Sequence, residues 1–417
     1  MARHSLLMIV VGLAAGLSGY LYQLAMGILL TGPEYATLLS LTSLLLIVSV
    51  FGDTITLTVA KQTSKLKSQG RLGAVNHIRR RFLKWTFVIG ILAFLLAVAF
   101  SPLLRGFIKS DSSLYSILLF SSLTLAFPLC SDWGVMQGLQ DFFPLAAARV
   151  AWALARPVLA VLLVYVGLGL SGGLAAVPLS YAVAFVVTVV GLRRLSRAGS
   201  EAVGTEGAGA YAGYTILALL SITMLANIDV VMANHYLPKD EAASYSAISV
   251  LGRICFYAPM GIALAMFPKT SDSFESKGSH RALFRKAALL AVLIVAPLCL
   301  IYAVFPSHIV HFLFSDKYPS VAPNIFIYGL GMSFLSLSYL TMTYFLSIGK
   351  TRVAYPLAVS AILQTLLIAL FHSSIEDLVH ALVISGAASL ALVLTLFVIP
   401  TRRGSTVDQP ASSTVEQ

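Results

Sequence analysis

The sequence predicts an all-α integral membrane protein with about twelve transmembrane helices, in two parallel halves of six. Three observations lead to this prediction. The 417 residues are 58% hydrophobic with a mean hydropathy of +0.88 and are only 11% charged, against roughly 25% in a soluble domain. The apolar residues form segments of about 20 residues, and the basic residues collect in every second connection between them. A soluble fold could not hide this much apolar surface, so the solvent of most of the chain is lipid.

Twelve apolar segments are long enough to cross about 30 Å of hydrocarbon, which takes roughly 20 helical residues. The first is longer than the apolar part of a signal peptide and lacks a clear cleavage site, so we interpret it as a retained helix. The expected spans are 5–30, 36–60, 85–107, 113–138, 143–167, 171–192, 213–236, 241–268, 287–305, 320–347, 353–371 and 376–399.

The basic residues orient these spans, because cytoplasmic connections are rich in Lys and Arg. Of the 28 Lys and Arg, only Arg105, Lys109, Lys239 and Lys317 lie in connections on one side, and three more lie inside spans. The other 21 are Arg3, eight within 61–84, three within 193–197, five within 269–286, Lys350, Arg352, Arg402 and Arg403. Both termini are therefore expected in the cytoplasm, with the protein in the inner (plasma) membrane. The net charge of +11 reflects this topology, and we expect no nucleic-acid partner.

Four regions follow from this division: an N-terminal six-helix lobe, a cytoplasmic linker rich in Gly, Ala and charge, a C-terminal six-helix lobe and a polar tail expected to be disordered. Their bounds are 1–192, 193–212, 213–403 and 404–417. An even number of spans in each half makes the two halves parallel repeats. The turn at 31–36 (TGPEYA) resembles the turn at 238–243 (PKDEAA), which supports the repeat.

Catalytic and metal-binding patterns are weak. No stretch outside the spans exceeds about 25 residues, so a soluble catalytic domain has no place, and we expect neither an enzyme nor a cofactor. The three cysteines lie singly, which indicates no disulfide framework. His308 and His311 share a helix face but have no third ligand, so no metal site is expected. Gly12 and Gly16 form a small-residue face suited to close helix contact.

Six ionisable residues fall inside the expected spans, where a charge costs about 3 kcal/mol and often has a role. They are Asp53, Asp132, Arg149, Arg156, Asp229 and Arg253. The first three lie at a similar depth, roughly 10 Å inside the cytoplasmic boundary, so we expect a structural salt bridge or an inner gate. Asp229 either pairs with Arg253 or carries a proton or sodium ion.

The positions of the arginines indicate an anionic ligand. Arg149 and Arg156 are seven residues apart on one face of span five, and Arg156 and Arg253 reach mid-membrane depth, one in each half. Guanidinium groups bind phosphate oxygens in paired, planar fashion. A lipid head group that carries phosphates is therefore a natural ligand for these residues.

Several stretches resemble the polysaccharide-biosynthesis flippases, whose superfamily also contains the multidrug and toxin extruders (MATE) and the peptidoglycan-precursor flippases. Their order and spacing carry the likeness, which covers roughly 1–270. One departure is Asp141, where the family often has a basic residue. The stretches are 20–35 (YLYQLAMGILLTGPEY), 137–142 (QGLQDF), 227–229 (NID) with 243–245 (ASY), and 251–253 (LGR) leading to 267–268 (FP).

This resemblance implies a MATE-like fold, with two six-helix lobes in a V around a central cavity, that moves undecaprenyl-diphosphate-linked oligosaccharide from the inner to the outer leaflet. It assigns the diphosphate to Arg253 and Arg156, with Arg149 beside them. Asp53, Asp132 and Asp229 are the candidates for gating or ion coupling, with H⁺ and Na⁺ both open.

The partners implied are the lipid-linked oligosaccharide, membrane lipids, and the glycosyltransferases and polymerase of a glycan pathway. Two alternatives stay open at this stage. One is an ion-coupled exporter of cationic small molecules, which would favour an acidic cavity. The other is a non-transporting scaffold for glycan-assembly enzymes.

Overall fold

The structure is a computed structural model that describes residues 2–193, 209–276, 278–315, 317–318 and 320–397. The described chain is helical and contains no strand. Its first half consists of α1 (Ala2–Leu29), α2 (Gly32–Ser68), α3 (Leu72–Ile108), α4 (Leu114–Phe120), α5 (Leu123–Leu139), α6 (Phe142–Leu163), the single π-helical turn η1 (Val164–Leu168) and α7 (Gly169–Gly191).

The second half repeats this order with more breaks. It consists of α9 (Gly209–Tyr236), α10 (Lys239–Gly252), α11 (Ile254–Tyr257), α12 (Met260–Glu275), α13 (His280–Val304), α14 (Pro306–Phe314), α15 (Val321–Ser347), the short 3₁₀ turn η2 (Thr351–Val353), α16 (Ala354–Leu370) and α17 (Ile375–Thr395).

Ten segments of the described chain are long and apolar enough to cross a membrane. One of them, Phe142–Gly191, has 50 residues, about twice what a single crossing needs. Gly167 and Gly169 have φ angles of 94° and 48° within it, a backbone that favours glycine, and they turn the chain so that α6 and α7 pack as a hairpin. With this segment counted twice and the 28-residue α1 added, the described helices match the twelve predicted spans.

One prediction about a connection was wrong. The segment 61–84, expected to be a cytoplasmic loop, is helical except at 69–71, because α2 and α3 both continue past the predicted membrane boundary. The fourth and eighth predicted spans are confirmed as Leu114–Leu139 and Lys239–Phe267, each with local breaks in its helix. The former is divided between α4 and α5, and the latter is interrupted at Arg253 and again at Ala258–Pro259.

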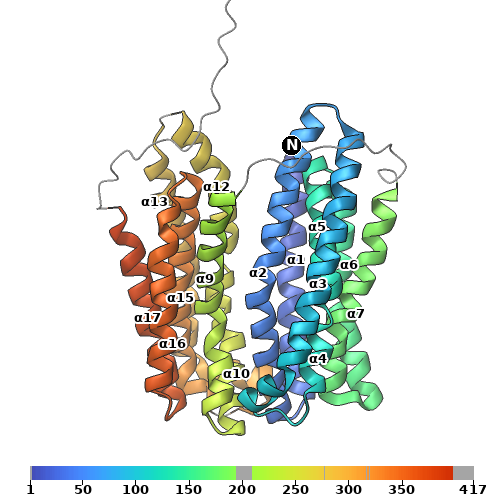
Figure 1. Ribbon diagram of the computed structural model, residues 1–417. Helices are drawn as coiled ribbons and strands as arrows, with labels where there is room; N and C mark the ends of the chain where they lie inside the picture. Colours follow the sequence, from blue (N-terminus) through green and yellow to red (C-terminus); the bar gives the residue numbers. More distant parts are fainter. Residues whose placement is uncertain (1, 194–208, 277, 316, 319, 398–417) are drawn as a thin grey trace, which may run out of the picture.

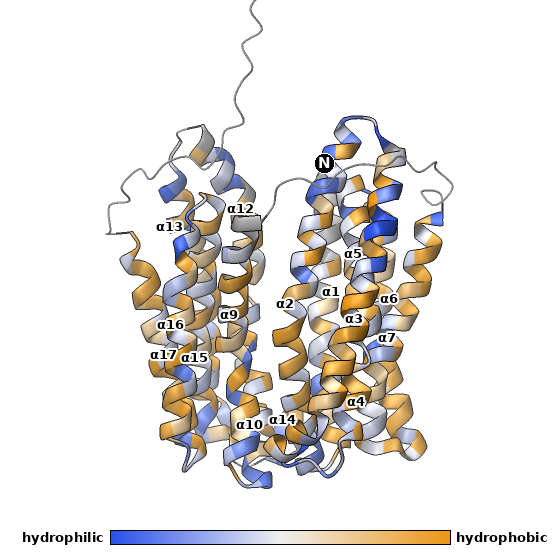
Figure 2. Cartoon of the chain, viewed as in Figure 1, coloured by the Kyte–Doolittle hydropathy of each residue, from blue (hydrophilic) through white to orange (hydrophobic). Residues whose placement is uncertain are grey.

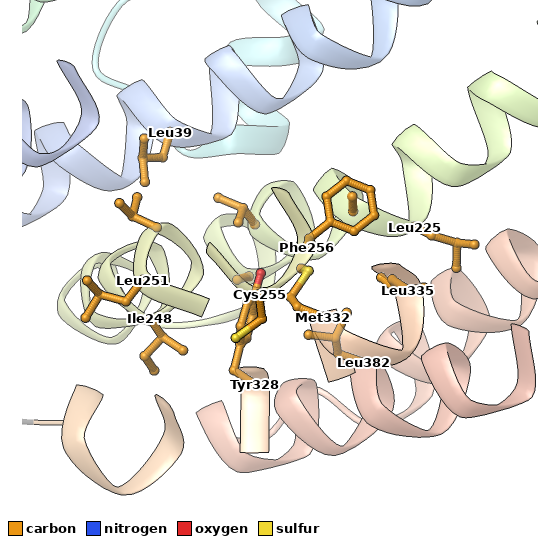
Figure 3. Packing of buried hydrophobic residues seen from close by; sticks show 14 of the residues in the cluster. Leu39, Leu225, Ile248, Leu251, Cys255, Phe256, Tyr328, Met332, Leu335 and Leu382 are labelled. Atoms are coloured by element: carbon orange, nitrogen blue, oxygen red, sulfur yellow. The ribbon is translucent and has the colours of Figure 1, made fainter. Parts of the chain in front are cut away.

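The helices form two bundles, α1–α7 and α9–α17, which meet at the end where α10 begins and stand apart at the end that carries the N-terminus (Figure 1). Hydrophobic residues cover the middle of the helices and hydrophilic ones gather towards their ends (Figure 2). Near the meeting end a single buried core joins the bundles, with Leu39 of α2 beside Ile248 and Leu251 of α10 (Figure 3). Most of the predicted linker 193–212 and all of the tail 404–417 lie outside the described residues.

Candidate functional site: an arginine pair among aromatic rings

Arg149 and Arg156 lie on α6 with half-buried side chains. The guanidinium carbon of Arg149 lies 5.2 Å from the centre of the Trp133 ring. That of Arg156 lies 5.0 Å from the Tyr22 ring and 5.3 Å from the Trp152 ring. Such cation–π contacts contribute about 2 kcal/mol when the cation has lost its water. Aromatic rings therefore hold both arginines inside the first bundle.

Neighbouring groups fix these rings. The Trp152 ring centre lies 6.2 Å from that of Trp133 and 5.6 Å from that of Tyr181. The Trp133 indole donates a hydrogen bond of 3.3 Å to a threonine hydroxyl of α7, and the Tyr22 hydroxyl donates one of 2.9 Å to a backbone carbonyl of α7. Together these residues form what we call the aromatic–arginine cluster: Tyr22, Trp133, Arg149, Trp152, Arg156 and Tyr181.

The two arginines of the cluster keep hydrogen-bond donors available. Within the described part of the chain neither forms an ion pair, and the Nε of each has no hydrogen-bond partner. Asp53 on α2 has an exposed side chain and interacts electrostatically with Arg149. Gly19 of α1 leaves room for Arg156, whose Nη2 lies 2.7 Å from where a Cβ at residue 19 would stand. The cluster can therefore accept an anion without first breaking an ion pair.

Asp132 lies elsewhere in the same bundle. Its fully buried carboxylate on α5 accepts two hydrogen bonds from Arg79 of α3, 2.7 Å from Nε to Oδ1 and 2.9 Å from Nη2 to Oδ2. The sequence grouped Asp132 with Arg149 at one depth, whereas the structure gives it Arg79, which the sequence had placed in a loop. A carboxylate held through both oxygens fixes α3 against α5, and this geometry does not favour a gating role.

Asp229 and Arg253 form a second buried ion pair, in the other bundle. Their side chains are 0% and 4% exposed, and Arg253 Nη2 lies 3.6 Å from Asp229 Oδ1. The hydroxyls of Tyr245 and Tyr328 donate to Asp229 Oδ2 at 3.1 and 2.7 Å. Arg253 also reaches across to α2, where its Nη2 donates to Ser43 Oγ at 3.4 Å. The sequence left Arg253 either free for the diphosphate or paired with Asp229. The structure shows the pair, and no described contact joins Arg253 to Arg156.

Sequence reasoning found the charged residues of these sites and, as one alternative, the pair of Asp229 with Arg253, but it missed the other partners. Trp152 lies three residues after Arg149 and four before Arg156, a spacing that puts all three side chains on one helix face. That spacing was the available signal. Tyr22 and Trp133 come from other helices, so no local pattern could connect them to the arginines.

The chemistry open to the cluster is binding. Two guanidinium groups can hold an anion, and the rings can cover apolar surface. Within the described residues, no three His, Cys, Asp or Glu side chains come together in a way that could hold a metal ion.

Solved structures with a similar fold are membrane transporters. A multidrug resistance MATE family transporter of the MOP superfamily, in an inward-facing conformation, has a TM-score of 0.76 at 12% identity, over 91% of this chain and 92% of that one. An outward-facing structure of such a transporter has a TM-score of 0.68 at 13% identity, over 94% of each chain. A MOP superfamily transporter from Pyrococcus furiosus, described by the reverse polarity of its binding pocket, has a TM-score of 0.66 at 13% identity, over 95% and 96%. The fold is that of a MATE-like membrane transporter.

The sequence family of the chain is more specific than the fold that it shares with these structures. A family model described as "Polysaccharide biosynthesis protein" matches residues 75–323, more than half of the chain. The chain belongs to this polysaccharide biosynthesis protein family. A related sequence, described as an uncharacterized membrane protein from Methanocaldococcus jannaschii, is 27% identical over 148 residues, which is 34% of this chain and 29% of that protein.

Proposed function

We propose that the protein is a flippase that moves an undecaprenyl-diphosphate-linked oligosaccharide from the inner to the outer leaflet of the plasma membrane by alternating access. The observation that carries this proposal is the aromatic–arginine cluster, with its half-buried Arg149 and Arg156 and no described ion pair on either. Guanidinium groups bind phosphate oxygens through paired hydrogen bonds. Aromatic rings offer flat apolar faces against which a sugar can lie.

In this proposal both termini lie in the cytoplasm, so the end at which the bundles stand apart faces the cytoplasmic leaflet (Figure 1). The higher TM-score with the inward-facing relative supports the same orientation. The head group enters between the bundles while its isoprenoid tail stays in lipid. Glycosyltransferases would supply this cargo on the cytoplasmic side, and a polymerase would consume it on the other.

The spacing of the two arginines suggests an order of contact. Seven residues of α6 correspond to a rise of about 10 Å, and Arg149 lies closer to the cytoplasmic end. The diphosphate meets Arg149 first, where it competes with the electrostatic interaction of the Asp53 carboxylate, and then passes to Arg156 among the rings. A carboxylate displaced in this way is suited to take up a proton, which makes Asp53 the coupling candidate of the proposal.

Arg253 has a different role here from the one that the sequence assigned to it. Its ion pair with Asp229 and its contact with Ser43 lie in the buried core between the bundles. We therefore assign Arg253 and Asp229 to the conformational change, and the diphosphate to Arg149 and Arg156.

A second candidate function is export of cationic small molecules, which the exposed carboxylate of Asp53 favours. The two arginines oppose it, because two fixed positive charges in the same bundle repel a cation. A non-transporting scaffold for glycan-assembly enzymes would have no need of either arginine.

The test is a flipping assay in liposomes that carry a fluorescent undecaprenyl-diphosphate oligosaccharide. The rate at which label becomes accessible to an external quencher is compared for the wild type, the Arg149→Ala/Arg156→Ala variant and the control Arg80→Ala. Arg80 is an exposed residue of α3 outside the cluster. We expect the double variant to lose at least tenfold in rate, since hydrogen bonds to charged groups contribute about 1.5–3 kcal/mol each.

Three outcomes are distinguishable. Movement in the wild type and the control, and its loss in the double variant, supports the proposal. No movement under imposed proton or sodium gradients, together with export of a cationic dye, moves the assignment to small-molecule export. If neither cargo is transported, the hypothesis of a non-transporting scaffold is favoured.

A further inference from the structure

The end of the molecule opposite the N-terminus carries a set of polar contacts between the bundles. Here α1 and α9 end, α2 and α10 begin, and the turns after α3 and α14 lie beside them (Figure 1). We call this region the closed end. The described hydrogen bonds that cross between the bundles are concentrated there and in the adjoining core.

Lys317, in the turn after α14, binds the C-terminal end of α1 in the other bundle. Its Nζ donates to the carbonyls of Gly27 at 3.0 Å and Ile28 at 3.2 Å, and also to that of Leu30. The Tyr318 hydroxyl donates to the same Gly27 carbonyl at 3.1 Å. The last carbonyls of a helix lack partners within it and form the negative end of its dipole. An ammonium group is the natural partner for them.

Lys109, in the turn after α3, makes the reverse contact. Its Nζ donates to the Leu237 carbonyl at 3.4 Å, just beyond the last residue of α9. Beside it the His235 ring stacks on that of Phe107 at 4.1 Å, and His235 Nδ1 donates to the Phe107 carbonyl at 2.7 Å. Each bundle therefore sends one lysine to the end of the other bundle's first helix.

The two contacts are related by the internal repeat. Leu30 and Leu237 immediately precede the similar turns 31–36 and 238–243. These turns also touch each other, because a Cβ at Gly32 would stand 3.2 Å from the Cβ of Ala243. Lys109 and Lys317 thus occupy equivalent places on either side of one closed end.

We propose that Lys109 and Lys317 are reciprocal latches that keep the closed end shut, and that their release opens it. Both side chains are exposed, so each ammonium regains water when the bundles separate, which makes the contact reversible. Lys317 is the stronger latch, with three carbonyl acceptors against one for Lys109. This inference concerns the conformational change and holds whatever the cargo is.

The test measures the distance between the bundles at the closed end. Nitroxide labels are placed on Leu114→Cys in α4 and Ser373→Cys beyond α16, two exposed positions in different bundles. Pulsed electron resonance on protein in lipid nanodiscs then gives the distance distribution. The background carries alanine at the native cysteines Cys130, Cys255 and Cys299.

Three lysine variants and one control are compared. We expect Lys317→Met to increase the population with a longer distance between the labels. The ratio of this population to the closed one should rise about tenfold or more over the wild type, because charge-assisted hydrogen bonds are lost. Lys109→Met should have a smaller effect, and the double variant the largest. Arg105→Met is the matched control, an exposed cation at the same end that forms no ion pair among the described residues.

A distribution unchanged from the control in the double variant overturns the proposal. Hydrogen exchange of the native-cysteine protein gives an independent reading, with faster exchange expected at 27–35 and 235–243 in the same variants. Protection unchanged at both turns also counts against the latches. Neither readout depends on transport, so failure here and failure of the flippase proposal are separable.

Discussion

Charged side chains within the membrane region belong to two groups. Asp132 and Asp229 are fully buried, and each has an arginine partner. Burying an ion costs several kcal/mol unless a partner and hydrogen bonds offset it. Arg149 and Arg156 are only half-buried and face aromatic rings. The first group holds helices together, and the second is suited to meet a ligand.

Removal of Asp132 tests the structural group. Asp132→Ala removes the carboxylate that binds Arg79, whose side chain is 9% exposed. We expect the free energy of unfolding to fall by about 3–5 kcal/mol, the usual cost of removing one partner of a buried ion pair. Asp111→Ala is the control, since its ion pair with Lys239 has side chains 77% and 48% exposed, and exposed pairs contribute about 0–1 kcal/mol. Thermal unfolding in one detergent measures both, and an equal, small change for the two variants would contradict the assignment.

Charged positions in the candidate site were predictable, and so was the pair of Asp229 with Arg253 as one alternative, but the other partners were not. Membrane energetics single out Asp132 and Arg149 because a charge in an apolar segment is costly. Depth along a helix does not say which way a side chain faces around it. Asp132 therefore pairs with Arg79 on α3 and not with Arg149 at its own depth. Asp229 pairs with Arg253, as one alternative predicted, and also accepts hydrogen bonds from two tyrosines that the sequence did not indicate.

At the level of elements, the first bundle is organised around the close approach of α2 and α5. A Cβ at Gly134 would stand 2.6 Å from the Thr56 carbonyl oxygen, and one at Gly138 would stand 2.6 Å from that of Ala60. Backbone atoms cannot move aside as a flexible side chain can. Small residues therefore let these helices touch, a common arrangement where lipid gives no hydrophobic drive.

Gly134→Ala is expected to lower the free energy of unfolding by roughly 1–3 kcal/mol, the usual cost of overpacking. Gly16→Ala is the matched control, because nothing lies within 4 Å of its would-be Cβ. Thermal unfolding of the two variants decides the point. If Gly134→Ala were stable and Gly16→Ala destabilised, this account would be contradicted. Gly12 and Gly16 would then form the contact face, as the sequence suggested.

The spans themselves were predictable because hydropathy reports directly on lipid exposure. Most predicted ends agree with the helices to within a few residues, as for 213–236 against α9 and 320–347 against α15. The helical parts of 61–84 were missed because Lys, Arg and Gln form helices well in water, where hydropathy carries no signal. The break at Arg253 was not predicted because the only turn-forming residue beside it is Gly252. The absence of a side chain at Gly252 makes room for the Tyr328 ring.

For the whole molecule, the two bundles differ in how their arginines are paired. The first carries the arginines that have no ion pair in the described chain, and the second keeps Arg253 paired with Asp229. They meet at one end and stand apart at the other (Figure 1). In our two proposals, anion binding in the first bundle and release of the lysine contacts at the closed end are steps of one cycle of alternating access.

The most direct test of the central claim is whether the aromatic–arginine cluster binds the diphosphate head group. The chain has three tryptophans, so a Trp85→Phe variant reports from Trp133 and Trp152 alone. Its fluorescence is titrated with undecaprenyl-diphosphate oligosaccharide, with the same glycan on uncharged undecaprenol, and with a cationic dye.

We expect a saturable change with the diphosphate lipid alone, weakened about tenfold or more by Arg156→Ala, since that variant loses charge-assisted hydrogen bonds. An equal response to the uncharged lipid, or a response to the dye and none to the diphosphate, would contradict the account.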